Sequence, residues 1–321
     1  MTPLWLAEIE LIVLIQRLPA WLEPVMEFLS FFAREEFFLL LLPILYWCVN
    51  PRLGVRVGIA LMLSGGINAI AKLVVHAPRP YWIGSEVKVL STEASFGMPS
   101  GHAQVSVGVW GVLVSGLRSK AAWWAAGIFA ILVSFSRLYL GVHFISDVVA
   151  GLLIGLVFLL LFLRFEDRLT AWWQRQRLSS QLLLAAVISA GMLGITVFLE
   201  MVYSGWTAPQ AWAHLSEVKP DSIDSLVGIS GSLFGLLAGG SVMWRLGWFD
   251  IAGPLWMKVV RWLVGGIGIG IIYYGLKQVF PEGETLIPSI LRYVRYALLT
   301  LWVQLGAPLL FLRIGLLKPT R

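Results

Sequence analysis

The sequence is poor in charged residues and has a single cysteine. Of its 321 residues, 13% are charged and 58% are hydrophobic, whereas ordinary soluble domains contain roughly 25% charged residues. The composition excludes an ordinary soluble domain and is typical of a chain that folds in a lipid bilayer. Because Cys48 is alone, an internal disulfide is excluded, and the redox compartment is not indicated.

The net charge of +6 does not point to a nucleic-acid partner. The Lys and Arg residues gather at the ends of apolar runs, as the positive-inside bias of membrane proteins produces. This distribution favours a membrane protein over one that binds nucleic acid. The first residues lack a basic segment, and Glu8 and Glu10 interrupt the first apolar run, so we expect no cleavable signal peptide.

Apolar segments long enough to cross a bilayer recur along the chain. Residues 4–31 are broken by charged residues and predict one or two interfacial helices, or a poor span. The predicted fold is an all-α, polytopic bundle of transmembrane helices. Spans of about 20 residues are predicted near 36–50, 54–75, 100–117, 121–140, 145–164, 181–203, 226–245, 257–277 and 289–312.

The same pattern predicts three consecutive regions. Residues 1–165 would form a core with five to six transmembrane helices, residues 166–180 a polar cytoplasmic linker, and residues 181–321 a C-terminal membrane region of about four helices without an assigned function. Glycine is abundant in the last region, which suits close helix packing in lipid. A cofactor-binding glycine loop is disfavoured because no strand precedes these glycines.

The positions of the cations predict the orientation in the membrane. Three loops would share the cytoplasmic side, and the loops 76–99 and 141–144 and the acidic segment 205–225 would then face outward. Arg292 and Arg295 fit this arrangement less well, because they would lie near the outer face. The loop cations behind the assignment include Arg52, Arg56, Arg118, Lys120, Arg164 and Arg168.

Polar residues border the outward loop 76–99 on both sides. Lys72 ends a predicted span and Arg79 lies between two prolines, so these two cations can close on one multivalent anion. Residues 99–102, Pro-Ser-Gly-His, open a predicted helix whose first amides and hydroxyl group suit an anion. His102 would stand beside that anion as a proton donor to a leaving oxygen.

A third polar segment, residues 136–147, lies between two apolar runs. His143 and Asp147 are four residues apart, so on a helix both side chains share one face and the carboxylate can hold one imidazole nitrogen. The other nitrogen would be free to attack as a nucleophile. Gly141 allows the chain to bend and bring Arg137 back over the imidazole.

Together, the three segments resemble the signature of the type 2 phosphatidic acid phosphatase superfamily, which includes bacterial acid phosphatases and vanadium haloperoxidases. The resemblance covers roughly residues 30 to 165, and no motif is recognised after them. It implies a helical core similar to that of acid phosphatases and haloperoxidases, to which this chain adds C-terminal transmembrane helices.

The resemblance also implies a role for each matching residue. His143 would be the nucleophile that forms a phosphohistidine, Asp147 would orient it, and His102 would protonate the leaving group and later activate water. No metal and no other cofactor are expected for hydrolysis. The residues that would hold the phosphoryl group are Lys72, Arg79, Ser100, Gly101 and Arg137.

The implied function is that of an integral phosphatase of the inner or plasma membrane, with its active site on the extracytoplasmic side. Its partners would be membrane lipids and a phosphorylated lipid or isoprenoid substrate, such as a lipid phosphate or polyprenyl diphosphate, and a homodimer is an open option. Two alternatives remain: a lipid phosphotransferase that uses the same phosphohistidine, and a non-catalytic phospholipid binder or transporter. A haloperoxidase is disfavoured by the membrane spans.

Several residues near the signature match no part of it. His76 and His214 are interpreted as loop histidines, and the aromatic pair of Tyr81 and Trp82 as interfacial anchors. Two further loop residues could contact a substrate head group, although the signature gives them no role: Glu93 and Ser95.

Overall fold

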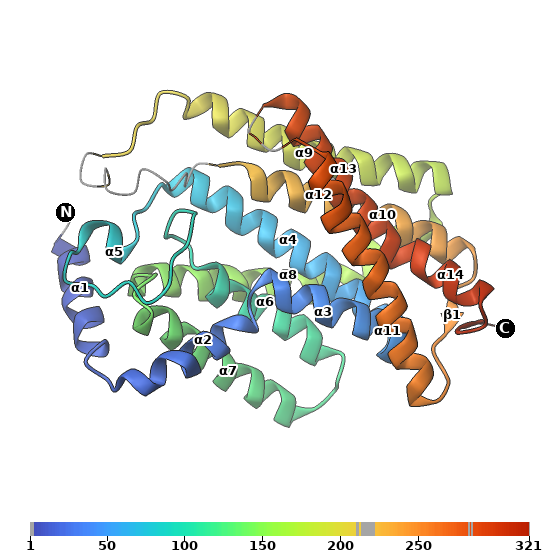
Figure 1. The fold of residues 1–321 in the computed structure, drawn as a ribbon, viewed down its shortest axis with the longest axis horizontal. Helices are drawn as coiled ribbons and strands as arrows, with labels where there is room; N and C mark the ends of the chain where they lie inside the picture. The colour runs from blue at the N-terminus through green and yellow to red at the C-terminus, as the bar shows by residue number, and fades with distance from the viewer. Residues whose placement is uncertain (1–2, 210–211, 213–221, 282, 284, 321) are drawn as a thin grey trace. The chain divides into compact units, whose positions relative to one another are not determined.

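The computed structural model describes residues 3–209, 212, 222–281, 283 and 285–320. Its regular structure is almost entirely helical, so the predicted all-α class is confirmed (Figure 1). Two short strands, β1 (Phe249–Asp250) and β2 (Lys318–Pro319), pair antiparallel. His214 and most of the acidic segment 205–225 lie outside the described residues.

The helices follow the predicted apolar runs closely. One difference is the polar segment 166–180, which is mostly helical because α8 runs on to Arg175 and α9 begins at Leu178. The α-helices are α1 (Pro3–Ile15), α2 (Glu23–Phe31), α3 (Glu35–Ile44), α4 (Pro51–Val75), α5 (Pro80–Ile83), α6 (Gly101–Ser115), α7 (Lys120–Tyr139), α8 (Ile145–Arg175), α9 (Leu178–Val202), α10 (Asp224–Arg245), α11 (Leu255–Gly270), α12 (Leu276–Val279), α13 (Leu286–Leu301) and α14 (Ala307–Arg313). A 3₁₀ turn, η1 (Ala20–Leu22), and three π-helical turns, η2 (Leu45–Val49), η4 (Ile271–Gly275) and η5 (Trp302–Gly306), complete the set.

Within the described residues, 7 helical stretches are long and apolar enough to cross a membrane. They correspond to seven of the nine predicted spans and indicate an integral membrane protein. The predicted spans near 36–50 and 100–117 correspond to shorter helices, since α3 has 10 residues before its π turn and α6 has 15. A straight helix needs about 20 residues to cross the hydrocarbon core.

The chain divides into two compact units that alternate along the sequence. Unit 1 contains residues 1–38, 67–162 and 197–222, and unit 2 contains residues 39–66, 163–196 and 223–321. The three consecutive regions expected from the sequence stay a prediction.

In unit 1, glycines on α8 allow this helix to approach α6 closely. A Cβ atom at Gly151 would lie 2.4 Å from the Ser100 carbonyl oxygen, and one at Gly155 would lie 2.6 Å from the Gln104 carbonyl oxygen. Small residues at such positions permit backbone contact between membrane helices. One turn before Gly151, the carbonyl of Asp147 accepts a hydrogen bond from the Ser100 amide at 2.9 Å. This packing joins two of the sequence motifs.

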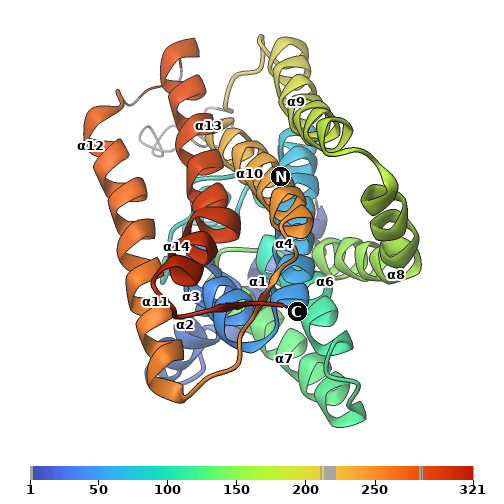
Figure 2. The same ribbon diagram turned by 90° about the vertical axis from the view of Figure 1, so that its right-hand side faces the viewer.

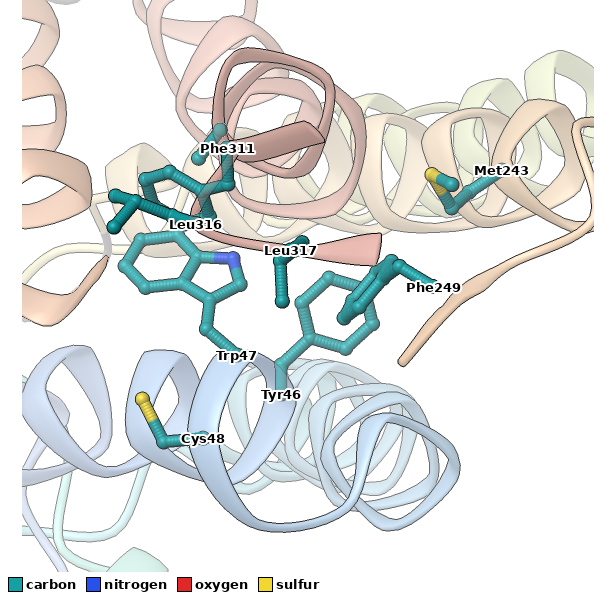
Figure 3. Packing of buried hydrophobic residues seen from close by; sticks show 9 residues of the cluster. Tyr46, Trp47, Cys48, Met243, Phe249, Phe311, Leu316 and Leu317 are labelled. Carbon is teal, nitrogen blue, oxygen red and sulfur yellow. The ribbon is translucent and has the colours of Figure 1, made fainter. Parts of the chain in front are cut away.

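In unit 2, α10 packs along α13 (Figure 2). Trp47 and Tyr46 extend from η2 into an apolar cluster (Figure 3). The Trp47 ring meets Phe311 edge-on with centroids 5.5 Å apart, and the Tyr46 ring meets Phe249 at 5.4 Å. The other members of this cluster are Cys48, Met243, Ala307, Leu316 and Leu317.

Hydrogen bonds from the same two aromatic residues connect the π turns η2 and η5. The Tyr46 hydroxyl donates to the Gln304 carbonyl and the Trp47 indole to the Val303 carbonyl, both at 2.9 Å. A π turn interrupts the regular helical ladder, and buried carbonyl groups need donors. The two aromatic side chains supply these donors inside unit 2.

Candidate active site

His143 and Asp147 form a buried pair at the start of α8. The imidazole Nδ1 lies 3.3 Å from Oδ2 of Asp147, and both side chains are only 1% exposed. The same Oδ2 accepts the backbone N–H of Phe144 at 3.0 Å. The helix begins at Ile145, two residues after His143, yet the pair meets as the four-residue spacing predicts.

The turn that carries this pair is supported by α1. Glu8 accepts hydrogen bonds from the backbone N–H and the hydroxyl of Ser146, at 2.8 and 3.0 Å. The rings of Trp5 and Phe144 stack with centroids 6.0 Å apart. The sequence showed Glu8 only as an interruption of an apolar run, because its partner is 138 residues away.

Arg79 and Lys72 converge on one short piece of the loop 76–99. The Lys72 Nζ atom donates to the Phe96 carbonyl at 2.6 Å and to the Ser95 hydroxyl at 2.9 Å. Arg79 donates to the same two oxygens, each at 3.1 Å, and its Nε donates to the Ser95 carbonyl at 2.6 Å. Ser95 therefore has a defined place in the site, as the loop residue that holds both cations.

Arg79 also reaches the imidazole of His143. Its NH1 group donates to the Val142 carbonyl at 2.9 Å and lies 3.4 Å from Nε2 of His143. The ring of His143 is thus held between a carboxylate at Nδ1 and a guanidinium at Nε2. A phosphoryl group that replaced the guanidinium contact would meet Nε2 directly.

Arg137 is fully buried in the same unit and pairs with Glu93. Its NH1 group donates to the hydroxyl of Ser30 at 3.1 Å, while its Nε has no hydrogen-bond partner within the described part of the chain. The bend expected at Gly141 is present, since this residue has φ +73° and a Cβ atom there would lie 2.8 Å from the Lys88 carbonyl oxygen.

The motif at residues 99–102 opens α6 as predicted. Ser100 is the N-cap residue and accepts the Ala103 amide at 3.5 Å, and Gly101 is the first helical residue. Nε2 of His102 is buried and makes no hydrogen bond in the part of the chain that the structure describes. A proton donor or acceptor is therefore available at this helix start.

Charge and burial set the ionisation of two groups in the loops. Burial, followed by Arg79 and Lys72, lowers the pKa of His143 well below its usual value, so the imidazole is neutral at physiological pH and can act as a nucleophile. Burial alone would raise the pKa of Glu93, but Arg137 and Arg79 lower it to about 2. Glu93 is therefore a carboxylate.

The structure places all eight residues predicted for the site in unit 1. Lys72 and Arg79 share the loop 95–96, and Arg79 also contacts His143. His143 pairs with Asp147, whose carbonyl accepts the Ser100 amide, and Gly101 and His102 follow directly on α6. Arg137 joins them through Glu93, which interacts electrostatically with Arg79, Lys72 and His102 as well. The described residues contain no group of three or more His, Cys, Asp and Glu suited to a metal ion.

Residues that the sequence analysis assigned to other roles support the site. Tyr81 and Trp82 are not interfacial anchors, because they are 8% and 1% exposed within unit 1. The Tyr81 hydroxyl accepts the Glu93 amide and donates to the Glu93 carbonyl, both at 3.2 Å. Tyr81 therefore fixes the backbone of Glu93, the residue whose carboxylate pairs with Arg137.

An aromatic cluster covers the loop 76–99. The ring of His76 lies 4.4 Å from Tyr203, 4.7 Å from Phe96 and 5.0 Å from Trp206, measured between centroids. Trp82 lies 5.2 Å from Trp212. His76 lies in the loop, as predicted, and its ring packs against three aromatic side chains. The cluster consists of His76, Trp82, Phe96, Tyr203, Trp206 and Trp212; its sequence signal was the three aromatic residues in the short segment 203–212.

Comparison with known sequences identifies the family. The profile described as PAP2 superfamily matches residues 53–171, a range that contains all eight site residues. The undecaprenyl-diphosphatase BcrC of Bacillus subtilis is 30% identical over 151 residues, which are 46% of this chain and 77% of that protein. The chain belongs to the PAP2 superfamily. The resemblance found in the motifs is thereby confirmed.

Other PAP2 relatives are matched over a smaller share of their own length. The glucose-6-phosphatase catalytic subunit 1 of Haplochromis nubilus is 26% identical over 214 residues, or 54% of this chain and 58% of that protein. Phosphatidylglycerophosphatase B of Bacillus subtilis is 31% identical over 118 residues, or 34% of this chain and 56% of that protein. The chain thus spans somewhat over half the length of these two relatives.

A second profile matches the C-terminal region, in which the sequence analysis recognised no motif. A profile described as PAP2 superfamily phosphatase, transmembrane extension, matches residues 227–319. Neither profile covers residues 172–226, and this interval supplies Tyr203, Trp206 and Trp212 of the aromatic cluster.

Proposed function

We propose that this chain hydrolyses a lipid phosphate or polyprenyl diphosphate through a phosphohistidine on His143, at the extracytoplasmic face of the membrane. The observation that carries the proposal is the buried imidazole of His143, held by Asp147 at one nitrogen and by Arg79 at the other. A neutral imidazole with one oriented nitrogen beside several cations suits attack on a phosphoryl group.

In the first step, Nε2 of His143 attacks phosphorus and forms the N–P bond as the P–O bond to the leaving oxygen breaks, an ester bond in a lipid phosphate and an anhydride bond in a diphosphate. The leaving oxygen takes a proton from His102, whose protonation the charge of a bound phosphate favours. Asp147 holds the proton at Nδ1 and stabilises the imidazole as it becomes positively charged. Lys72, Arg79 and Arg137 offset the charge on the phosphoryl oxygens.

In the second step, water attacks the phosphohistidine. His102, now neutral, takes a proton from the water, the N–P bond breaks, and inorganic phosphate leaves with the bonding electrons returned to the imidazole. Both steps use the same cations, so the phosphoryl group stays bound throughout. His102 acts first on the leaving oxygen and then on the attacking water. Metal-free hydrolysis stays a prediction.

The membrane setting and the relatives support an amphiphilic substrate. The matched relatives include a phosphatidylglycerophosphatase, an undecaprenyl-diphosphatase and, in mouse, sphingosine-1-phosphate phosphatase 2. A phosphate site beside membrane helices suits a molecule whose head group reaches the cations while its chain stays in lipid. The loop cations support the outward orientation, and the homodimer remains an open option.

The intermediate can be trapped to test the mechanism. Enzyme mixed with a radiolabelled lipid phosphate and quenched in denaturant should carry an acid-labile, base-stable label on His143. His143→Ala should lose the label, while His76→Gln, which changes a histidine outside the signature, should keep it. A label on serine or aspartate would refute the mechanism.

Two product measurements separate the alternatives. A phosphatase releases inorganic phosphate, whereas a phosphotransferase passes the label to an added lipid or sugar acceptor. A phospholipid binder or transporter would show neither product. Asp147→Asn should lower kcat more than it raises KM, because the change affects the nucleophile and leaves the cations in place.

A further inference from the structure

Two arginines on α13 lie where a membrane helix rarely carries charge. Arg292 and Arg295 come six and nine residues after Leu286, the first residue of the apolar stretch Leu286–Arg313. At about 1.5 Å per residue they lie about 9 and about 14 Å along the helix. Ionisable residues at such depth are costly and usually mark a functional site. These are also the cations that fitted the predicted orientation poorly.

The two guanidinium groups have different partners. Arg292 forms an ion pair with Asp224, in the first turn of α10. Arg295 is 9% exposed and forms no ion pair among the described residues, and its Nε has no hydrogen-bond partner there. Asp224 therefore pairs with Arg292 and leaves Arg295 without a carboxylate partner among the described residues.

Two aromatic rings lie beside the guanidinium group of Arg295. Its guanidinium carbon lies 5.5 Å from the ring centroid of Tyr273 and 5.4 Å from that of Tyr296. Ring faces attract a cation but accept none of its in-plane N–H groups. Tyr273 belongs to the π turn η4, and such turns occur frequently at functional sites. The guanidinium is held in place with donor capacity remaining.

Hydrogen bonds on the neighbouring face of α13 fix how this helix is turned. The Ser189 hydroxyl lies 2.9 Å from the hydroxyl of Tyr293 and donates to the Ser230 carbonyl at 2.7 Å. A Cβ atom at Gly231 would lie 2.3 Å from the Tyr293 carbonyl oxygen, so α10 and α13 touch through their backbones. The arginine pair cannot turn away toward water without breaking this contact.

We propose that Arg292 and Arg295 form a second anion site, in unit 2, that binds the phosphate group of a membrane lipid. Two planar guanidinium groups match the oxygens of a phosphate ester. The depth along α13 favours a phosphate that arrives attached to an acyl or isoprenoid chain over a free ion. Asp224 occupies Arg292 when the ligand is absent and competes with it. The choice of a lipid phosphate as the ligand rests on the proposed function. The inference that Arg295 binds an anion does not, because it rests on the burial and the unpartnered Nε of this arginine.

The test counts bound lipid on the full chain. The parent protein carries His143→Ala so that phosphatidate is not hydrolysed, and native mass spectrometry measures the dioleoyl phosphatidate retained per chain. Adding Arg292→Gln and Arg295→Gln should remove one bound phosphatidate. Arg313→Gln, which removes an exposed cation from α14, is the matched control and should leave the count unchanged.

A variant with the opposite effect keeps the proposal testable if the double variant fails to fold. Asp224→Asn frees Arg292 from its carboxylate, so it should tighten phosphatidate binding at the second site by about tenfold. Inorganic phosphate at millimolar concentration should not displace the second lipid. Displacement would overturn the assignment to a lipid-borne phosphate.

Equal lipid counts in the parent and the double variant, or weaker binding in Asp224→Asn, would overturn the site. The proposed function is tested separately, with the native His143 and the release of inorganic phosphate. If no lipid phosphate is hydrolysed, the proposed function fails while the lipid count still decides the second site. In the hydrolytically active chain, Arg295→Gln should leave turnover of a water-soluble short-chain phosphate ester unchanged.

Discussion

Arg137 in unit 1 and Arg261 in unit 2 are both fully buried, but their partners differ. Arg261 donates to the carbonyl oxygens of four residues at 2.8 to 3.2 Å: Trp47, Ile251, Ala252 and Leu316. Arg137 has one hydroxyl partner, one carboxylate partner and an Nε without a hydrogen bond among the described residues. The carboxylate, on Glu93, is 27% exposed.

The contrast shows how a buried cation can serve either structure or binding. Carbonyl groups satisfy the donors of Arg261 permanently, because they belong to the backbone that the arginine holds together. The partner of Arg137 is a side chain that can move, so its donors can be offered to a phosphoryl oxygen. The available donors, more than the burial, support the proposal that Arg137 binds the phosphoryl group.

The largest expected effect comes from Arg137→Gln. Loss of a guanidinium that stabilises the transition state should lower kcat/KM for a lipid phosphate by about a thousandfold. Phosphate release per folded molecule measures this, because loss of the ion pair with Glu93 also lowers the stability of the fold. A large loss of stability with nearly normal turnover would reverse the roles given to the two arginines.

Arg261→Gln should give the converse result. Several buried carbonyl groups lose their donor, so the free energy of unfolding should fall by about 3 kcal/mol. Denaturant or thermal unfolding in detergent measures the change, and turnover per folded molecule should stay within about twofold of the parent. A loss of turnover without a loss of stability would contradict a purely structural role.

Glu93→Gln sharpens the comparison by removing the charge that Arg137 faces. Inorganic phosphate should then inhibit about tenfold more strongly, because it no longer competes with a carboxylate. Inhibition constants measured at constant ionic strength provide the test. Unchanged or weaker inhibition would show that Glu93 positions Arg137 without competing for it.

The same variant has a predictable pH dependence. The pKa of Glu93 is about 2 in the folded protein, below the roughly 4.3 of a free glutamate. Its ion pair therefore stabilises the fold fully above roughly pH 4.3, and this contribution is lost as the pH falls from there through about 2. Glu93→Gln should lack that part of the acid destabilisation in a series of unfolding midpoints.

The smallest expected effect is that of Trp206→Ala. This ring packs against Phe96 at 5.4 Å, and the Phe96 carbonyl accepts from both Lys72 and Arg79. Without this packing the Phe96 carbonyl should hold Lys72 and Arg79 less precisely. The resulting small misplacement of these cations should lower kcat/KM by about threefold to tenfold. Trp124→Ala, at a ring that is 76% exposed on α7, should have no effect. Equal effects of Trp206→Ala and Trp124→Ala would show that the aromatic cluster does not support the site.

Much of the site could be predicted because its chemistry is local in sequence. The pairing of His143 with Asp147 follows from a four-residue spacing, and the helix start at Ser100, where an anion site is proposed, follows from the Pro-Ser-Gly motif. The helices could be predicted from apolar length alone. The short α6 begins where its span was predicted and is shorter at its C-terminal end, since it ends at Ser115 and Gly116 is its C-cap.

The remaining contacts depend on tertiary packing that one sequence does not reveal. Glu8 meets Ser146 across 138 residues, and the hydroxyl of Ser30 meets Arg137 across 107. Tyr81 was predicted to be an anchor at the membrane interface. Its burial depends on contacts with the loop around Glu93, which the sequence does not reveal. The donors that satisfy the carbonyl groups of the π turns η2 and η5 come from residues far away in the sequence, so these contacts could not be predicted.

The interrupted layout of unit 1 affects how the protein is made. Its last piece, residues 197–222, carries the rings of Tyr203 and Trp206, which lie against His76. The ribosome synthesises all eight predicted site residues before it reaches these rings. A truncated product that stops after α8 would hold the whole signature while the Phe96 loop lacks its cover, so catalytic competence should appear late in biosynthesis.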